Sequence, residues 1–421
     1  MRALACLLLA AALAGPATAA DDPPAPDASE LINVLLSGLM GFTDMSGPEL
    51  QTEVAAVGGI PFRSEVPLEY MTRAELTRYL KEVLDSEYPP ARAEADQRML
   101  QAFDLLPAGA DLRALRGRIL EENIVGFYDE RPGKKRLYAV SEQRKLTPAN
   151  QLILSHELRH ALQDQYADIH GVLPDSVGDF DDRRMAFLSV LEGDATLVME
   201  RFLVHRLTGD KADKDDEVPS FSMPTPPMPD VPPVLRDQLL LPYFAGRDFA
   251  QSLQKKGGWD ALKQAWIHPP ESTEQVLHPE KYDAREPPRS VDLSYAPRGG
   301  RLINDGVLGE ILIRTFLGEG APEEAAAGWG GDRYRVWDLS GKTLLVWRSV
   351  WDSATDMREF LAAAQARVGS RHAAAGTRHG YRVFGSPSRW MAIGERASGI
   401  DFVSSDDEPA FDAALRALAG S

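Results

Sequence analysis

The chain has 421 residues, of which 44% are hydrophobic and 8% aromatic, enough apolar material for two or three packed domains. Its formal net charge of −17 at pH 7 argues against nucleic acid or an anionic membrane surface as a partner. Only one cysteine, Cys6, is present, so a disulfide framework is excluded.

The first 19 residues have the composition of a secretory signal peptide. A basic start at Met1-Arg2 precedes the apolar stretch Ala3–Ala14 and a small-residue cleavage site at Ala17–Ala19, the order typical of export signals. The stretch is too short for a spanning helix with stop-transfer flanks, the alternative being an uncleaved anchor. We therefore expect an exported, periplasmic or extracellular protein that begins near Ala20. Because Cys6 leaves with the signal, thiol catalysis is excluded.

The next hundred residues are predicted to be mostly helical, over 28–122. Thr72 and Glu75 have capping-box spacing before the apolar-periodic stretch 76–84. The period then changes. Two short strand-like runs, 124–128 and 136–140, lie on either side of a turn-forming stretch with Pro and Gly, which predicts a β-hairpin.

The run 154–162 contains the pattern H-E-x-x-H. On a helix, His156 and His160 project from the same face and can bind one metal ion. Glu157 lies one turn before His160 and can reach a water on that metal, whose pKa the metal lowers. The alternative is an ordinary helix whose two histidines face water.

A catalytic zinc ion needs a third protein ligand. The metzincin solution requires Gly at 163 and His at 166, but the chain has Gln163 and Tyr166, which excludes it. The other common solution is a glutamate on a following helix. The stretch 185–203 has the pattern of a long helix and carries Glu192, 32 residues after His160.

Gly193 lies inside this second helix, where glycine costs roughly 1 kcal/mol relative to alanine. Close packing against the histidine-bearing helix would explain the glycine and would bring Glu192 towards the metal. Glu192 as a solvated surface carboxylate is the alternative. Other residues that could supply the third ligand are Asp168, His170, Asp179, Asp181 and Asp194.

With His156, Glu157, His160 and Glu192 (within Glu-Gly-Asp-Ala), the chain resembles the gluzincin zinc metallopeptidases. The longer run 155–165 also resembles a group of secreted bacterial zincin-like proteins. This resemblance implies one Zn²⁺ per chain, held by the two histidines and Glu192, a polypeptide substrate, and Glu157 as general base and proton shuttle. The aspartate that thermolysin-like members have four residues after the glutamate ligand is Thr196 here, so that support does not carry over.

Gluzincins typically add a Tyr or His donor for the carbonyl oxygen, and the resemblance implies one here. Our first candidate is His278, because Pro279 and the upstream Pro269-Pro270 would stiffen its loop. Tyr282 and Tyr243 follow. The alternative is that His278 is a structural loop residue bonded to backbone.

The rest of the chain has no second chemical motif. The stretch 210–233, charged at first and then proline-rich, is predicted to be a linker or a lid. Helices are expected near 235–256 and 306–318, and mixed strands and helices over 332–419. The run Ser340-Gly341-Lys342-Thr343 invites a phosphate-loop interpretation, but Val336 replaces the first glycine and the context favours a hairpin turn.

Together these patterns predict a helix-rich α+β protein with a zincin-like core, formed by a strand hairpin, the H-E-x-x-H helix and the Glu-ligand helix, and a small C-terminal α+β domain. The predicted function is a secreted zinc-dependent peptidase without stable membrane insertion. The alternatives are an inactive zincin-fold binding or scaffold protein and a non-peptide amide hydrolase. The oligomeric state stays open. The expected division is signal peptide 1–19, helical region 20–119, metal-binding core 120–210, linker or lid 211–234, helical region 235–325 and C-terminal domain 326–421.

Overall fold

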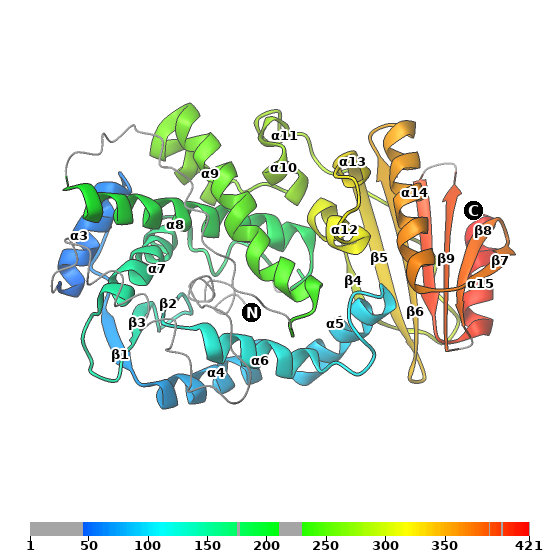
Figure 1. Cartoon of the computed structure of the whole chain (residues 1–421), viewed down its shortest axis with the longest axis horizontal. Helices are drawn as coiled ribbons and strands as arrows, with labels where there is room; N and C mark the ends of the chain where they lie inside the picture. The colour runs from blue at the N-terminus through cyan, green and yellow to red at the C-terminus, as the bar shows by residue number, and fades with distance from the viewer. Residues whose placement is uncertain (1–44, 175–176, 210–229, 387, 397–398, 421) are drawn as a thin grey trace.

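The computed structural model describes residues 45–174, 177–209, 230–386, 388–396 and 399–420 (Figure 1). The expected signal peptide, and the expected linker up to residue 229, lie outside these ranges. The described chain is a mixed α+β structure with two sheets, as the sequence predicts. None of its helices is both long and apolar enough to cross a membrane.

In the described part of the chain, helices and one strand precede the hairpin and the H-E-x-x-H run. Their N-terminal caps follow the sequence closely: the Thr72 side chain accepts from the Glu75 backbone N–H, and the Glu75 carboxylate accepts from the Thr72 N–H, which is the predicted capping box. The Asp111 side chain caps the last of them by accepting from the Ala114 backbone N–H, without a reciprocal partner. The elements are α3 Gly47–Val57, β1 Leu68–Met71, α4 Arg73–Glu87, α5 Pro90–Ala102 and α6 Leu112–Asn123.

A three-stranded sheet follows, in the order β1-β3-β2. The predicted hairpin is confirmed, with β2 Gly126–Asp129 antiparallel to β3 Arg136–Val140. β1 pairs with β3 in parallel, which was not foreseen because its surroundings have a helical pattern. Gly126 lets β2 lie close to the next helix, since a Cβ there would be 2.8 Å from the Leu154 side chain.

Three long helices come next: α7 Pro148–Ala167, α8 Asp182–Thr208 and α9 Pro233–Ile267. A capping box between Thr147 and Asn150 starts α7. α9 is kinked at Gly257 and Gly258 and packs along α8, as the green ribbons of Figure 1 show.

The predicted packing of Gly193 is wrong. A Cβ at Gly193 would lie 2.0 Å from the backbone C and O of Gly246 on α9, and a Cβ at Gly246 would lie 2.0 Å from Ser189 O. The two glycines therefore allow backbone contact between α8 and α9. The close partner of Gly193 is α9 and not the histidine-bearing α7.

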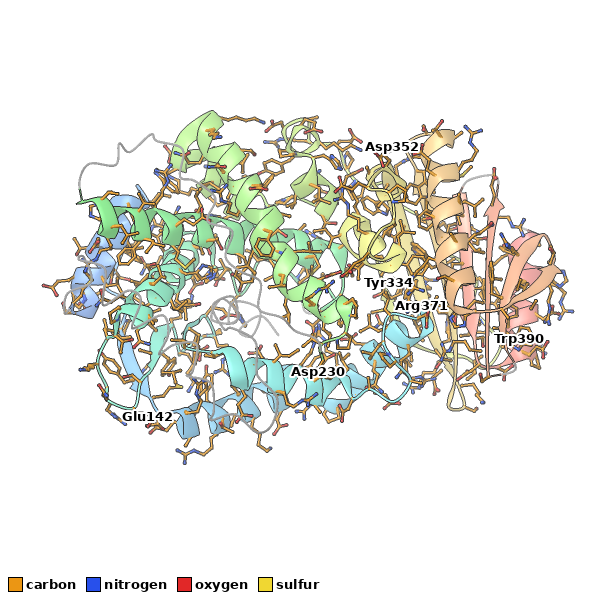
Figure 2. All side chains as sticks on the ribbon, viewed as in Figure 1. Glu142, Asp230, Tyr334, Asp352, Arg371 and Trp390 are labelled. Atoms are coloured by element: carbon orange, nitrogen blue, oxygen red, sulfur yellow. The ribbon has the colours of Figure 1, made fainter. Side chains whose placement is uncertain are left out.

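The C-terminal part is built on a seven-stranded antiparallel sheet in the order β4-β5-β6-β10-β9-β8-β7. Trp347 packs in the same core as α14, whereas the adjacent Val346 packs with α15, so these helices cover opposite faces. Tyr334 and Trp390 mark the sheet in Figure 2. The elements are α10 Thr273–Leu277, α11 Pro279–Asp283, β4 Arg301–Gly306, α12 Gly309–Leu317, α13 Glu324–Ala327, β5 Trp329–Leu339, β6 Lys342–Trp351, α14 Ala354–Arg371, β7 Ala374–Arg378, β8 Tyr381–Ser386, β9 Arg389–Arg396, β10 Gly399–Ser405 and α15 Glu408–Ala419.

The first strand of this sheet and the turn between β5 and β6 can be compared with the sequence-based predictions. The expected boundary at 326 falls inside the unit, because β4 lies in the region predicted to be helical and pairs with β5. Ser340 and Gly341 both have positive φ (55° and 92°) and join β5 to β6. This is the predicted hairpin turn and not a phosphate loop.

Candidate metal centre

Three side-chain atoms converge between α7 and α8. The Nε2 atoms of His156 and His160 lie 3.0 Å apart, and Glu192 Oε2 lies 3.1 Å from the first and 3.4 Å from the second. Zinc–ligand bonds of about 2.0–2.1 Å in a tetrahedron place ligand atoms about 3.3 Å apart, so the three atoms match the spacing of a zinc site. Within the described ranges, no other group of three such residues comes together in this way.

The charge states also fit a metal. All three residues are at most 1% exposed. Burial lowers the pKa of His156, which favours the neutral ring that a metal requires. Burial alone would raise the pKa of Glu192, but the two histidines outweigh it and hold that pKa at about 2.

Two atoms of this cluster have no hydrogen-bond partner in the described part of the chain: His156 Nδ1 and Glu192 Oε1. A buried, unsatisfied polar group costs about 1–3 kcal/mol, and more when charged. A cation between the three ligand atoms would offset the buried negative charge of Glu192. The buried charge of Glu192, with Oε1 unpartnered in the described part of the chain, therefore fits a metal ion better than a cluster held by hydrogen bonds alone.

Glu157 is next to the first ligand and only 1% exposed. Its Oε2 accepts a hydrogen bond of 3.0 Å from the backbone N–H of Tyr128 on β2. Burial raises the pKa of this carboxyl to about 8, and the nearby Glu192 charge acts in the same direction. The Tyr128 hydroxyl donates to Asp164 Oδ2 at 2.7 Å, so the strand that holds Glu157 is fastened to α7 at two points.

The other residues that the sequence offered as a third ligand make different contacts. Asp179 accepts from Arg92 and pairs with Arg116. Asp181 caps α8 and accepts from the Val307 N–H. Asp168, with a positive φ of 46°, ends α7 on the surface, and His170 lies in the turn that follows.

Asp194 lies near the ligands but is paired away from them. Arg159 donates to both of its carboxylate oxygens, at 2.8 and 2.9 Å, and Gln163 donates to Oδ2 at 2.8 Å. Gln163 also places Oε1 2.8 Å from His160 Nδ1. Sequence reasoning missed this contact, whose only signal is the three-residue spacing on one helix face.

His278 is not placed at the cluster, which corrects our first candidate for the oxyanion donor. Its Nε2 lies 3.0 and 3.2 Å from the two carboxylate oxygens of Glu310, and this hydrogen bond raises the pKa of His278. The helix before it, α10, is tied to Asp182, whose Oδ1 accepts from the Thr273 backbone N–H. Asp182 starts α8, ten residues before Glu192, a helix distance of about 15 Å.

The other two donor candidates differ in position. The Tyr282 hydroxyl donates to the His268 carbonyl at 2.8 Å, which assigns it to the α9–α11 contact. The Tyr243 ring lies against the His156 ring, with centroids 5.9 Å apart and an interplanar angle of 22°. Of the three candidates, Tyr243 is the one that touches the metal centre.

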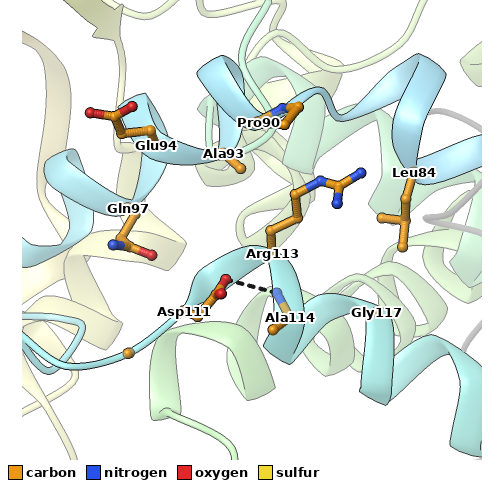
Figure 3. A pocket seen from close by; sticks show the side chains of 10 residues that line it. Leu84, Pro90, Ala93, Glu94, Gln97, Asp111, Arg113, Ala114 and Gly117 are labelled. Atoms are coloured by element: carbon orange, nitrogen blue, oxygen red, sulfur yellow. Dashed lines mark hydrogen bonds between the residues drawn. The ribbon is translucent and has the colours of Figure 1, made fainter. Parts of the chain in front are cut away.

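A separate surface cavity of about 620 Å³ lies between α5 and α6 (Figure 3). Arg113 and Gln97 point towards it from these two helices. None of the three ligand residues lines it, so this cavity is not an approach to the metal centre.

Comparisons with known proteins concern the other end of the molecule. The model of a family described as a domain of unknown function (DUF8575) matches residues 300–395, from the start of β4 into β9. Neither the curated proteins nor the solved structures contain a significant match to the chain. The matched segment holds none of the three residues of the cluster, so this match bears on the C-terminal sheet and not on the cluster.

Proposed function

We propose that the chain is an exported, zinc-dependent peptidase of gluzincin type, in which His156, His160 and Glu192 hold the metal. The observation that carries the proposal is the convergence of their three ligand atoms within 3.4 Å of one another. The order of hairpin, H-E-x-x-H helix and Glu-bearing helix supports a zincin-like core.

A bound zinc ion supplies a Lewis acid for a scissile carbonyl and lowers the pKa of a water molecule. The positive charge of a bound zinc ion would lower the pKa of Glu157 from about 8, so that its carboxylate could accept the proton of that water and pass it to the leaving amine. The Tyr128 N–H holds one of its carboxylate oxygens and so limits how the side chain can turn. Tyr243, against His156, is the remaining candidate to donate to the carbonyl oxygen.

The test is cleavage of an unbiased peptide library by the mature protein, whose N-terminus should lie near Ala20. Wild type should cleave and lose activity when a chelator removes zinc. Glu157→Gln should keep zinc and the melting temperature, because the amide preserves the shape of the side chain. Its turnover should fall about 10²–10⁴-fold, since it cannot accept the proton. Equal cleavage by both proteins would contradict the proposed role of Glu157.

Burial favours a second candidate, an inactive zincin-fold protein that binds zinc without turnover. All three ligands and Glu157 are at most 1% exposed, so a polypeptide reaches them only if covering residues move. A zinc-loaded protein that cleaves nothing, and that loses thermal stability when zinc is removed, would support this candidate. Turnover of small acyl amides without peptide cleavage would instead support a non-peptide amide hydrolase.

A further inference from the structure

A buried chain of hydrogen bonds ends on the ligand His160. Its members, Arg159, Gln163 and Asp194, each have no exposed surface. They come from both metal-binding helices, so the chain connects the orientation of His160 on α7 to the position of α8. None of the three is a metal ligand.

The direction of each bond follows from its partners. The Gln163 amide nitrogen donates to Leu191 O at 3.0 Å and to Asp194 Oδ2 at 2.8 Å, and both partners only accept. Its oxygen must then face His160 Nδ1, at 2.8 Å. An oxygen acceptor requires a proton on Nδ1. In the neutral form that a metal requires, the ring of His160 therefore keeps its lone pair on Nε2, the atom that faces His156 and Glu192.

Arg159 fixes the far end of the chain. It donates twice to Asp194 and once to the carbonyl of Gly58, at 3.1 Å. Its guanidinium lies 5.0 Å from the rings of both Trp259 and Trp266. A bidentate pair next to two rings has little freedom to rotate, so Asp194 keeps Gln163 from flipping its amide.

We propose that Gln163 is a positioning residue of the metal centre, which sets the tautomer and ring orientation of His160, and that the Arg159–Asp194 pair holds Gln163 in place. The inference rests on the proposed function in one respect, that His160 binds the metal. Partners of this kind typically change metal affinity about 10–100-fold when removed.

The experiment compares two like substitutions on α7. Gln163→Met removes the acceptor at nearly constant volume. Gln165→Met is the matched control, because Gln165 bonds outward to Arg63 and Ser64. Metal-free protein with ¹⁵N-labelled histidine gives the tautomer of His160 by long-range ¹H–¹⁵N spectra, assigned with a His160→Gln variant. Competition with a chelator gives the zinc dissociation constant.

Wild type and Gln165→Met should show His160 protonated at Nδ1. Gln163→Met should lose this preference and bind zinc about 10–100-fold more weakly. The double variant Gln163→Glu with Asp194→Asn keeps an acceptor for Nδ1 and a hydrogen bond between 163 and 194, but it removes the donor to Leu191 O. It should therefore restore the tautomer and part of the affinity. This variant also decides the matter if Gln163→Met does not fold.

A folded Gln163→Met protein with wild-type tautomer and affinity would overturn the proposal, as would a folded double variant that fails to restore the tautomer. The tautomer is read without metal, so the two failures can be told apart. If wild type binds no zinc, the proposed function fails, while the spectra still show whether Gln163 orients His160.

Discussion

Gly193→Ala should destabilise the protein although it replaces glycine within a helix. The new Cβ would lie 2.0 Å from the Gly246 backbone, whereas ordinary contact begins near 3.4 Å, so α8 and α9 must separate by about 1.4 Å. Overpacking costs up to about 3 kcal/mol, because backbone atoms cannot turn aside. Helix propensity returns about 1 kcal/mol. The free energy of unfolding should therefore fall by about 2 kcal/mol.

The matched control is Gly117→Ala on α6. A Cβ there would meet the Leu84 side chain at 3.5 Å, an ordinary contact, so only the gain in helix propensity remains, about 1 kcal/mol. Urea unfolding of both variants, followed by circular dichroism, measures the difference. Zinc affinity should fall in Gly193→Ala alone, since Glu192 moves with α8. If Gly193→Ala is as stable as Gly117→Ala, the close α8–α9 contact is wrong.

Three further changes test other parts of the structure. Asp332→Asn should lower the free energy of unfolding by at least about 2 kcal/mol. Each Asp332 carboxylate oxygen accepts from two buried N–H groups, and the amide nitrogen of Asn would leave two of these donors unsatisfied. An unchanged urea midpoint would contradict this. Burial raises the pKa of Asp96 to about 6, so its contribution to stability is full below about pH 4 and is lost as pH rises through about 6. Asp96→Asn should make the free energy of unfolding less dependent on pH between about 4 and 6. An unchanged slope of that free energy against pH would refute the raised pKa of Asp96. His278→Ala should leave zinc affinity and kcat near wild type, whereas Tyr243→Phe should lower kcat by about 10²-fold or more; the reverse pattern would restore His278 as the donor.

Local patterns predicted much of the structure. The capping box of Thr72 and Glu75 is found where the sequence predicts it, because capping depends on residues three positions apart. The hairpin before α7 follows from a change of hydrophobic period. The pair His156 and His160 follows from helix geometry alone, and Glu192 was found because chemistry requires a third ligand.

Contacts between distant segments could not be predicted in this way. The partner of Gly193 is on α9, more than fifty residues away, and nothing near Gly193 in the sequence indicates it. The parallel pairing of β1 with β3 and the membership of β4 in the C-terminal sheet depend likewise on tertiary packing. The stiffness of its loop suggested His278 as the donor to the carbonyl oxygen. In the structure, its ring instead pairs with Glu310, thirty-two residues later.

Zinc titration of the metal-free mature protein, followed by X-ray absorption of the loaded protein, tests the metal centre most directly. We expect one zinc ion per chain, with nitrogen and oxygen ligands at about 2.0–2.2 Å and no sulfur. His160→Ala and Glu192→Ala should each weaken binding strongly. No stoichiometric zinc in the wild-type protein, or wild-type affinity in both variants, would contradict the assignment of His156, His160 and Glu192 as the metal site.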